Sequence, residues 1–199
     1  MTVIQGKVTG LYRNGGTKVE ERAAEVVAIP YFANCNRERC EMRVWLPEGP
    51  QLARPRTIAD GARASASHCW QADTLDALND HREPASSDDT KIPRFTWWDH
   101  RGTKEWVQYD FDRPQKVSAV EVYWWDERRI KANCRVPQSW RLLYKDGAEW
   151  RPVSGASEYG SQMDRFNRVT FDAVETRALR LEVQLQPGWS GGILEWRVE

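Results

Sequence analysis

The chain has 199 residues, with 29 basic residues, 29 acidic residues and 11 tryptophans. Because its formal net charge at pH 7 is zero, bulk charge gives it no means of holding a nucleic acid or an anionic membrane. No apolar run approaches the roughly 20 residues that cross a bilayer. The first ten residues, MTVIQGKVTG, contain no basic region followed by an apolar one, so we expect no signal peptide there.

The first fifty residues predict strands and no helix. Residues 1–14 and 17–29 read as two strands around Asn14-Gly15-Gly16, a sequence that tolerates the positive φ of a hairpin turn. A third strand is expected at 41–47. Three strands bury too little apolar surface to be stable alone, so we expect this segment to pack against a larger body or to belong to one.

Two alternating runs, at 105–111 and 117–124, mark the centre of the predicted fold. In each run large apolar residues alternate with polar or small ones, which places one face on a core and the other toward water. We interpret Asp112-Arg113-Pro114-Gln115 between them as a turn, because proline fixes φ and has no amide hydrogen for a strand ladder. The two runs would then form an antiparallel pair.

Short strands bounded by turn residues continue to the end of the chain, at 140–144, 149–153, 167–171, 178–185 and 193–198. At least seven such strands fit an all-β fold, an antiparallel β-sandwich of the jelly-roll kind. Its core is expected to bury eight of the alternating apolar residues: Val107, Tyr109, Phe111, Val120, Val122, Leu142, Leu181 and Val183.

The cysteines, histidines and carboxylates form no recognisable catalytic motif. Cys35 and Cys40 are five apart, which matches neither CxxC nor a zinc ribbon, so we expect reduced thiols. His68 beside Cys69 is the one neighbour that suggests a metal, and we do not predict zinc from it. No carboxylate pair has a motif context and no nucleophile elbow is present. We therefore predict no catalytic residue and no enzymatic activity of the chain by itself.

Five segments resemble, in this order, a discoidin domain: ASASHCWQADTLDALND, EWVQYDFDRPQKVSAVEVYWWD, SWRLLYKDGAEWRPV, RVTFDAVETRALRLEVQ and GGILEWRV. This is the coagulation factor five/eight C-type, galactose-binding-like jelly roll, which includes the carbohydrate-binding modules of family 32. The resemblance covers residues 62–199. It implies a sandwich in which loops at one end make the ligand surface.

A narrower resemblance concerns the rest of the chain. IPRFTWW, CRVPQSWRLLYKDG and GGILEW resemble the C-terminal copy of this domain in bacterial enzymes similar to glycoside hydrolase family 127, the β-L-arabinofuranosidases. AIPYFANCNRERCEMRVWLPE resembles the end of the β-sandwich that follows those enzymes' helical barrel, with Arg37-Glu38-Arg39-Cys40 in place of a glycine-proline-glycine turn. The barrel, with its zinc-bound cysteine nucleophile and acidic partner, has no counterpart here. We thus expect a sandwich remnant at 1–50, a linker at 51–61 and a discoidin-like domain at 62–199.

The resemblance places the ligand loops at 79–101, 126–135 and 186–192. Sugars present apolar CH faces and hydroxyls, so a sugar site needs an aromatic platform with polar groups around it. Six residues in these loops have suitable side chains: Trp98, His100, Arg101, Asp126, Arg128 and Trp189. The arginines of the second loop can equally belong to a solvated loop.

The sequence predicts that some of the tryptophans are buried in the core and that others are exposed. In Trp97-Trp98 and Trp124-Trp125 neighbouring side chains point opposite ways on an extended backbone, so we expect Trp97 and Trp124 to be the buried members. Trp189 has no strand pattern, and we expect Gly188, Gly191 and Gly192 to let it turn outward. Trp98 and Trp189 should lie at the same end of the sandwich, at least one of them exposed as a stacking platform.

The resemblance also implies a structural calcium ion near the loop that follows a short helical turn at 74–79. Asn79 or Asp80, with Glu195 in the last strand, stand at the matching positions, although Asn79-Asp80 replaces the family's usual Asp-Gly. Calcium takes six to eight oxygen ligands, of which backbone carbonyls would supply the remainder. Such an ion would fix a loop and would carry no chemistry.

Two functions remain open. The first is a non-catalytic carbohydrate-binding or accessory module of a bacterial glycoside hydrolase of the β-L-arabinofuranosidase type. Its partner would be a plant-type or other polysaccharide with galactose- or arabinose-like units. The second is a structural cap that packs on a catalytic barrel and binds no sugar. The sequence does not decide the compartment.

Overall fold

The computed structural model describes residues 3–8, 22–27, 34–36, 39–41 and 57–199 of the chain, which divides into two compact units, 1–54 and 55–199. In the first unit β1 (Val3–Val8) pairs antiparallel with β2 (Arg22–Val27), and β3 (Asn34–Asn36) pairs antiparallel with β4 (Arg39–Glu41). The predicted turn at 14–16, and the strand predicted at 41–47 except for its first residue, lie outside the described residues.

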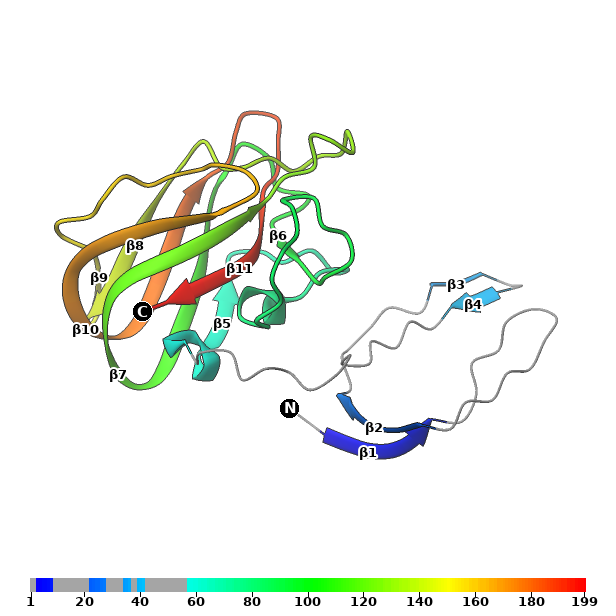
Figure 1. The fold of residues 1–199 in the computed structure, drawn as a ribbon. Coiled ribbons are helices and arrows are strands. Elements are labelled where there is room, and N and C mark those ends of the chain that lie inside the picture. Colours follow the sequence, from blue (N-terminus) through cyan, green and yellow to red (C-terminus); the bar gives the residue numbers. More distant parts are fainter. Residues whose placement is uncertain (1–2, 9–21, 28–33, 37–38, 42–56) are drawn as a thin grey trace. The chain divides into compact units, whose positions relative to one another are not determined.

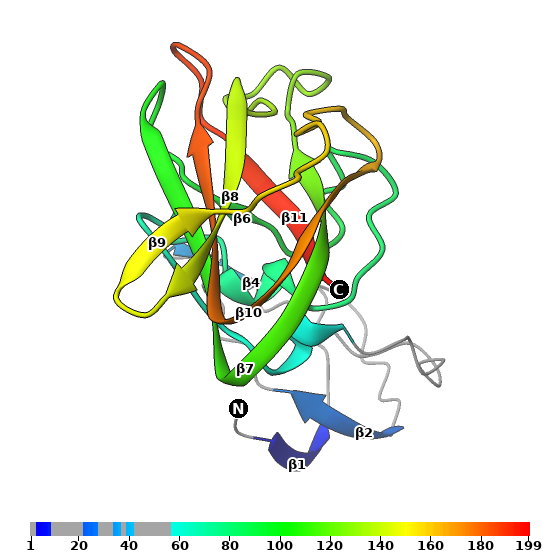
Figure 2. The same ribbon diagram turned by 90° about the vertical axis from the view of Figure 1, so that its left-hand side faces the viewer.

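The second unit is an antiparallel β-sandwich (Figures 1 and 2). It contains the 3₁₀ helices η1 (Ile58–Gly61) and η2 (Leu75–Leu78) and the strands β5 (Arg63–Ala66), β6 (Phe95–Thr96), β7 (Lys104–Trp125), β8 (Ser139–Asp146), β9 (Glu149–Pro152), β10 (Phe166–Gln184) and β11 (Gly192–Val198). The strand order is β6-β11-β7-β10-β8-β9, and β5 also pairs with β7. This architecture confirms the predicted all-β fold class. η1 falls inside the segment predicted as a linker.

Two long strands, β7 and β10, run through both layers of the sandwich, as their curvature in Figure 2 shows. The start of β7 pairs with the end of β10, from Lys104↔Gln184 to Asp110↔Ala178, and its remainder pairs with the start of β10. The register shifts between Thr170 and Val174 and between Thr176 and Ala178. Such irregularities bend a strand pair, which here turns the corner between the layers.

The predicted hairpin between 105–111 and 117–124 is therefore wrong: both runs belong to β7, and β10 is the partner of each. Likewise, the strands predicted at 167–171 and 178–185 are one strand, β10. Residues 112–114 are exposed at the bend of β7, between the paired positions Asp110 and Gln115. A proline is tolerated there because the ladder is interrupted and needs no amide hydrogen from it.

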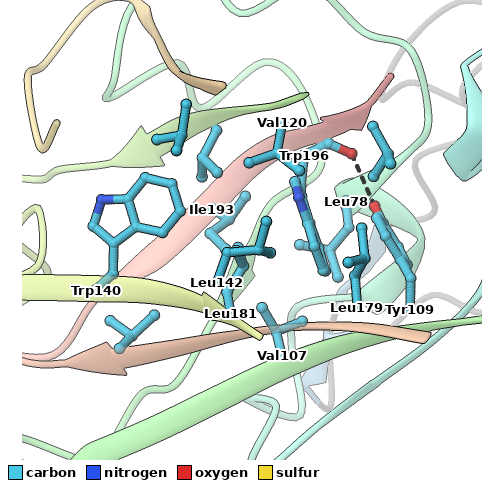
Figure 3. Close-up of a cluster of buried hydrophobic side chains, with 14 of the residues drawn as sticks. Leu78, Val107, Tyr109, Val120, Trp140, Leu142, Leu179, Leu181, Ile193 and Trp196 are labelled. Carbon is cyan, nitrogen blue, oxygen red and sulfur yellow. Dashed lines mark hydrogen bonds between the residues drawn. The ribbon is translucent and has the colours of Figure 1, made fainter. Parts of the chain in front are cut away.

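The core lies between the two layers, and all eight residues predicted for it are buried. Figure 3 shows its centre, where the Tyr109 and Trp196 rings stack with centroids 4.0 Å apart. The Tyr109 hydroxyl donates a hydrogen bond of 3.1 Å to the Trp196 carbonyl, so the one polar atom of that ring is satisfied. The apolar face of each alternating strand therefore packs on the opposite layer, as the period of two requires.

A second, smaller cluster lies outside this core and buries Tyr123, Trp125, Cys134 and Leu194. Trp97 and Trp124 are buried as predicted, but Trp125 is fully buried as well. Alternation along β7 does place Trp125 on the outer face, and there loop residues cover it. The Arg94 guanidinium lies 4.7 Å from its ring centroid, and the Asp126 amide donates to the Ser87 carbonyl beside it.

Among the described residues, no helix is long and apolar enough to span a membrane. Cys69 and Cys134 are free thiols. Burial, with the Asp73 carboxylate nearby, raises the pKa of Cys69 to about 11, so this thiol stays protonated at neutral pH. The side chains of Cys35 and Cys40 lie outside the description.

Candidate ligand-binding site

Three loops meet at one rim of the sandwich, and we call them the rim surface: residues 97–103, 126–138 and 185–191. Backbone hydrogen bonds join them. The Gly102 amide donates to the Trp189 carbonyl over 3.1 Å, and the Arg135 amide donates to the Ser190 carbonyl over 2.9 Å. The Ser190 amide donates in turn to the Asn133 carbonyl over 3.0 Å. In Figures 1 and 2 the three loops lie at the upper end of the sandwich.

Trp189 is the exposed aromatic residue of this surface, with 36% of its area accessible. The Arg135 guanidinium carbon lies 3.8 Å from its ring centroid, and Arg135 Nη1 donates to the carbonyls of Ala132 and Cys134. Arg135 therefore covers one face of a ring that stays partly accessible. A cation held in this way restricts the rotation of an exposed ring.

The glycines around Trp189 serve two purposes. Gly188 has a φ of +78°, a conformation that favours glycine. By contrast, a Cβ at Gly192 would lie 2.4 Å from the Phe95 carbonyl oxygen, and one at Gly191 would lie 2.8 Å from a Leu185 methyl carbon. Gly188 is thus required for its positive φ, whereas Gly191 and Gly192 are required because neighbouring atoms leave no space for a side chain. The prediction assigned freedom to all three glycines.

Trp98 lies half-buried on the first loop, at the same rim as Trp189. The Arg101 guanidinium lies 4.5 Å from its ring centroid, and the Trp70 ring meets it edge-on at 6.4 Å. Arg101 Nη2 also donates to Asn133 Oδ1 over 3.3 Å. Arg101 therefore connects the first loop to the second while keeping an exposed side chain.

His100 is oriented by a buried carboxylate, Glu105. The distance from His100 Nδ1 to Glu105 Oε1 is 2.7 Å, and the hydroxyls of Ser67 and Thr103 also donate to this carboxylate. Burial raises the pKa of Glu105, but the hydrogen bonds from Ser67, Thr103 and His100 outweigh it and hold the pKa below its usual value. An ionised Glu105 requires Nδ1 to carry the hydrogen, so a neutral His100 presents Nε2 as an acceptor.

The His68 ring packs against the His100 side chain. Its ring stacks on His100 with centroids 4.2 Å apart and an angle of 17° between the planes. His68 Nε2 lies 2.6 Å from the Trp98 carbonyl oxygen and donates to it. The His100 ring is thus held by contacts on one face and at one edge.

Asp126 and Arg128 have a different role from the one expected. Asp126 is fully buried, and its carboxylate accepts from the backbone amides of Arg128 and Val136 over 2.9 and 3.0 Å. The Arg128 guanidinium binds the same carboxylate over 3.0 and 3.1 Å. The Asp126 carboxylate therefore shapes the second loop instead of facing a ligand. Arg128 is half-exposed, but its guanidinium is engaged with Asp126.

The residues considered for calcium, Asn79, Asp80 and Glu195, lie where β11 passes η1 and η2. Glu195 is 1% exposed, and its Oε2 has no hydrogen-bond partner among the described residues. Burial, with the negative charge of Asp80, raises the pKa of Glu195 to about 8. Asn79 Nδ2 donates to the Ala59 carbonyl over 2.6 Å, which leaves its amide oxygen available. A buried carboxylate oxygen without a donor, close to a second acid, fits a hard cation.

This donor set is small. Among the residues that the structure describes, no group of three or more His, Cys, Asp or Glu side chains could hold a metal ion. Backbone carbonyls would therefore have to supply most of the ligands that calcium needs.

The sequence interpretation missed four side chains of the rim: His68, Glu105, Asn133 and Arg135. Glu105 carried a signal, because it occupies an inward position of an alternating strand, where an acid needs buried partners. Asn133 and Arg135 carried none, since loop residues have no periodicity and their contacts depend on how the loop closes.

Comparison with known proteins gives two family matches. The family model F5/8 type C domain matches residues 62–196. The model of the Glycoside hydrolase family 127 C-terminal domain matches residues 7–47. No curated protein sequence matches the chain.

Solved structures share the fold at low sequence identity. A structure from the Streptococcus pneumoniae beta-galactosidase BgaA has a TM-score of 0.57 and 19% identity, over 70% of this chain and 92% of that one. The family 32 CBM from C. perfringens NanJ in complex with galactose has a TM-score of 0.55 and 14% identity, over 71% of this chain and 96% of that one. A Ruminococcus gnavus GH29 fucosidase in complex with fucose has a TM-score of 0.50 and 14% identity, over 72% of this chain and 26% of that one.

Proposed function

Because the chain belongs to the F5/8 type C domain family, we propose that it is a non-catalytic carbohydrate-binding accessory module whose ligand binds at the rim surface. The observation that carries the proposal is the exposed Trp189 ring, fixed by Arg135 on loops that are hydrogen-bonded to those of His100 and Arg101. A rigid aromatic platform loses little conformational entropy on binding.

The side chains around the platform offer the polar groups that a sugar requires. His100 Nε2 accepts a hydrogen bond from a sugar hydroxyl, and the Arg101 guanidinium donates to ring or hydroxyl oxygens. The sugar's apolar face stacks on Trp189, from which it displaces water. Trp98 lies behind Arg101 and fixes its position. Binding and orientation are all that these groups perform, and no bond is made or broken.

A finer proposal concerns the protein context. We propose that residues 1–50 are the end of a glycoside hydrolase family 127-type sandwich, joined through 51–61 to the binding module at 62–199. The match of residues 7–47 to the C-terminal domain model of that family supports this arrangement. The module would then accompany a catalytic domain of the β-L-arabinofuranosidase type. Galactose- and arabinose-like units are the first ligands to examine, the former because the NanJ module binds galactose.

We also propose that Glu195, with Asn79 or Asp80 and backbone carbonyls, holds a structural calcium ion. The ion would give the buried Oε2 atom of Glu195 the partner that it lacks among the described residues. Its effect is to fix the chain between η2 and β6 against β11.

The test is a glycan array with the isolated chain, followed by calorimetric titration of galactose, arabinose and the glycans that the array retains. Trp189→Ala is expected to weaken binding at least tenfold, because the platform is lost. Ile130→Ala is the matched control, since Ile130 is an exposed apolar residue (50%) on the second rim loop outside the Trp189 contacts. If wild type retains no glycan on the array, the structural-cap function replaces the proposal. If Trp189→Ala binds as well as wild type, the ligand lies elsewhere.

A further inference from the structure

A groove lies beside the rim surface, on the outer face of the layer formed by β7, β10 and β8. Its volume is about 450 Å³. Six of its lining residues lie on the outer face of these strands: Lys104, Trp106, Ser139, Arg141, Glu182 and Gln184. They come from the first residues of β7 and β8 and the last residues of β10, so the groove opens at the ends of the strands nearest the rim.

The strand register explains why these side chains gather. Gln184 pairs with Lys104 on one side and Ser139 on the other. Glu182 pairs in the same way with Trp106 and Arg141. Residues two apart on a strand share a face, so the six side chains make two adjacent rows across the outside of the layer. The buried Val107, Leu181 and Leu142 alternate with them and face the core.

Trp106 is held in place from below. The Arg180 guanidinium lies 4.5 Å from its ring centroid and 4.2 Å from that of Trp150. Arg180 Nη2 also donates to Gln108 Oε1 over 2.7 Å. Arg180 therefore covers one part of the Trp106 ring, and the part that lines the groove is fixed before any ligand arrives. The contact between Arg180 and Trp106 thus resembles the contact between Arg135 and Trp189 on the rim surface.

The groove continues from the rim surface. Gln184 Nε2 donates to the Gly102 carbonyl over 2.9 Å and to the Leu185 carbonyl over 3.1 Å, and both carbonyls belong to rim loops. These bonds use the amide hydrogens, which leaves Gln184 Oε1 as an acceptor toward the groove. Arg141 and Glu182 form an ion pair across the second row, with a carboxylate and a guanidinium side by side.

We propose that this groove is a second sugar subsite, so that the module binds an internal stretch of a glycan chain and not only a single terminal sugar. The proposal rests on the proposed function of the rim surface. An aromatic platform bordered by an ammonium, a hydroxyl, an amide oxygen and an ion pair suits a sugar ring with many hydroxyls. A protein partner would be better matched by a larger apolar surface than one tryptophan provides.

The experiment measures affinity against chain length by calorimetry. The probes are two series of one to five units, β-1,4-linked galactose and α-1,5-linked arabinose. In the series that binds, wild-type affinity should rise about tenfold from one unit to three, which corresponds to about 1.4 kcal/mol. Trp106→Ala should abolish this rise and leave the affinity for the single unit unchanged. Ile130→Ala is the control, because it removes an exposed apolar side chain that does not line the groove.

The outcomes separate the two proposals. Wild-type affinity that is independent of chain length, or a rise that survives in Trp106→Ala, overturns the second subsite while the rim site stands. Absence of binding at every length in both series, together with a glycan array on which wild type retains nothing, overturns the proposed function itself, and the subsite falls with it. Arg141→Ala provides a second variant, expected to lower only the gain with length, and melting temperatures confirm that each variant is folded.

Discussion

Glu105 and Glu195 are both buried acids on strands of the same sandwich, 5% and 1% exposed, yet their surroundings move their pKa values in opposite directions. Glu105 stands at the start of β7, beside the rim surface. Glu195 stands in β11, beside η1 and η2. Burial alone raises the pKa of a carboxyl group, so the difference comes from what each carboxylate meets once it is buried.

At Glu105 the protein supplies every partner. Two hydroxyls and the His100 ring donate to the carboxylate, and these bonds stabilise its ionised form. At Glu195 one oxygen has no donor among the described residues, and Asp80 adds a second negative charge. The rim is thus complete in itself, whereas the Oε2 atom of Glu195 has no donor among the described residues, although the Arg197 guanidinium lies 3.9 Å from Oε1. The fully partnered carboxylate of Glu105 and the unpartnered oxygen of Glu195 therefore lie at separate places.

The largest expected effect concerns Glu195 and pH. Its pKa of about 8 in the folded chain lies above the ordinary value of 4.5. Between these values the folded chain holds a proton that the unfolded chain has released. The contribution of Glu195 to the free energy of unfolding is therefore fully present below about pH 4.5 and is lost as the pH rises toward 8. We expect the free energy of unfolding in a chelator to fall by on the order of 3 kcal/mol between pH 5 and pH 8.5, since each pKa unit corresponds to about 1.4 kcal/mol.

Urea denaturation across this pH range, in the presence of a chelator, measures the effect. Glu195→Gln should flatten the profile because it cannot ionise, and Glu158→Gln, at an exposed position, should leave it unchanged. A wild-type profile already as flat as that of Glu195→Gln would show that the two acids do not differ.

Calcium should restore what ionisation of Glu195 removes. At pH 8, calcium at about 100 times its dissociation constant is expected to stabilise the folded chain by about 2.7 kcal/mol. At pH 5 the gain should be smaller, since the ion must compete with the proton on Glu195. Thermal denaturation with and without calcium measures both values, with magnesium as the control ion. An equal calcium effect in wild type and Glu195→Gln would exclude Glu195 as a ligand.

Glu105 should show the opposite pH dependence with a smaller amplitude. Its pKa is lowered on folding, so its contribution is present above its unfolded value and is lost as pH falls through the folded value. We expect Glu105→Gln to cost about 1–2 kcal/mol at pH 7, because charge-assisted hydrogen bonds become neutral ones. The cost should shrink below pH 4. A cost independent of pH would mean that packing, and not charge, is what Glu105 contributes.

The fold was predictable from the sequence because burial alternates along most of the two long strands, β7 and β10. Val107, Tyr109, Leu181 and Val183 face the core as the period of two requires. The sequence did not predict that β7 is one continuous strand. A proline such as Pro114 is compatible both with an exposed bend within a strand and with a turn between two strands. Only the register of β10 distinguishes the two.

The candidate site was predictable in part, and the reason is local. Trp189 and Trp98 are conspicuous in sequence and lie on hydrogen-bonded loops. Asp126 looked like a ligand residue, but loop closure buries it against the amide of Val136. Trp125 looked exposed by alternation, and a loop covers it. Burial by a loop depends on segments that are distant in the sequence, so the periodicity of the sequence does not reveal it.

We expect the smallest effect on stability from the substitution of Trp189. This substitution also tests whether the rim loops are held together by their own hydrogen bonds. If the hydrogen bonds of Gly102, Arg135 and Ser190 hold the loops together, removing the exposed ring should change the free energy of unfolding by less than about 0.5 kcal/mol. The control is Trp125→Ala, which removes a fully buried ring and should cost about 3–5 kcal/mol. Urea denaturation of both variants in calcium measures the two values. A loss of several kcal/mol in Trp189→Ala would mean that the ring holds the loops in place, and the rim would then depend on its platform for stability as well as for binding.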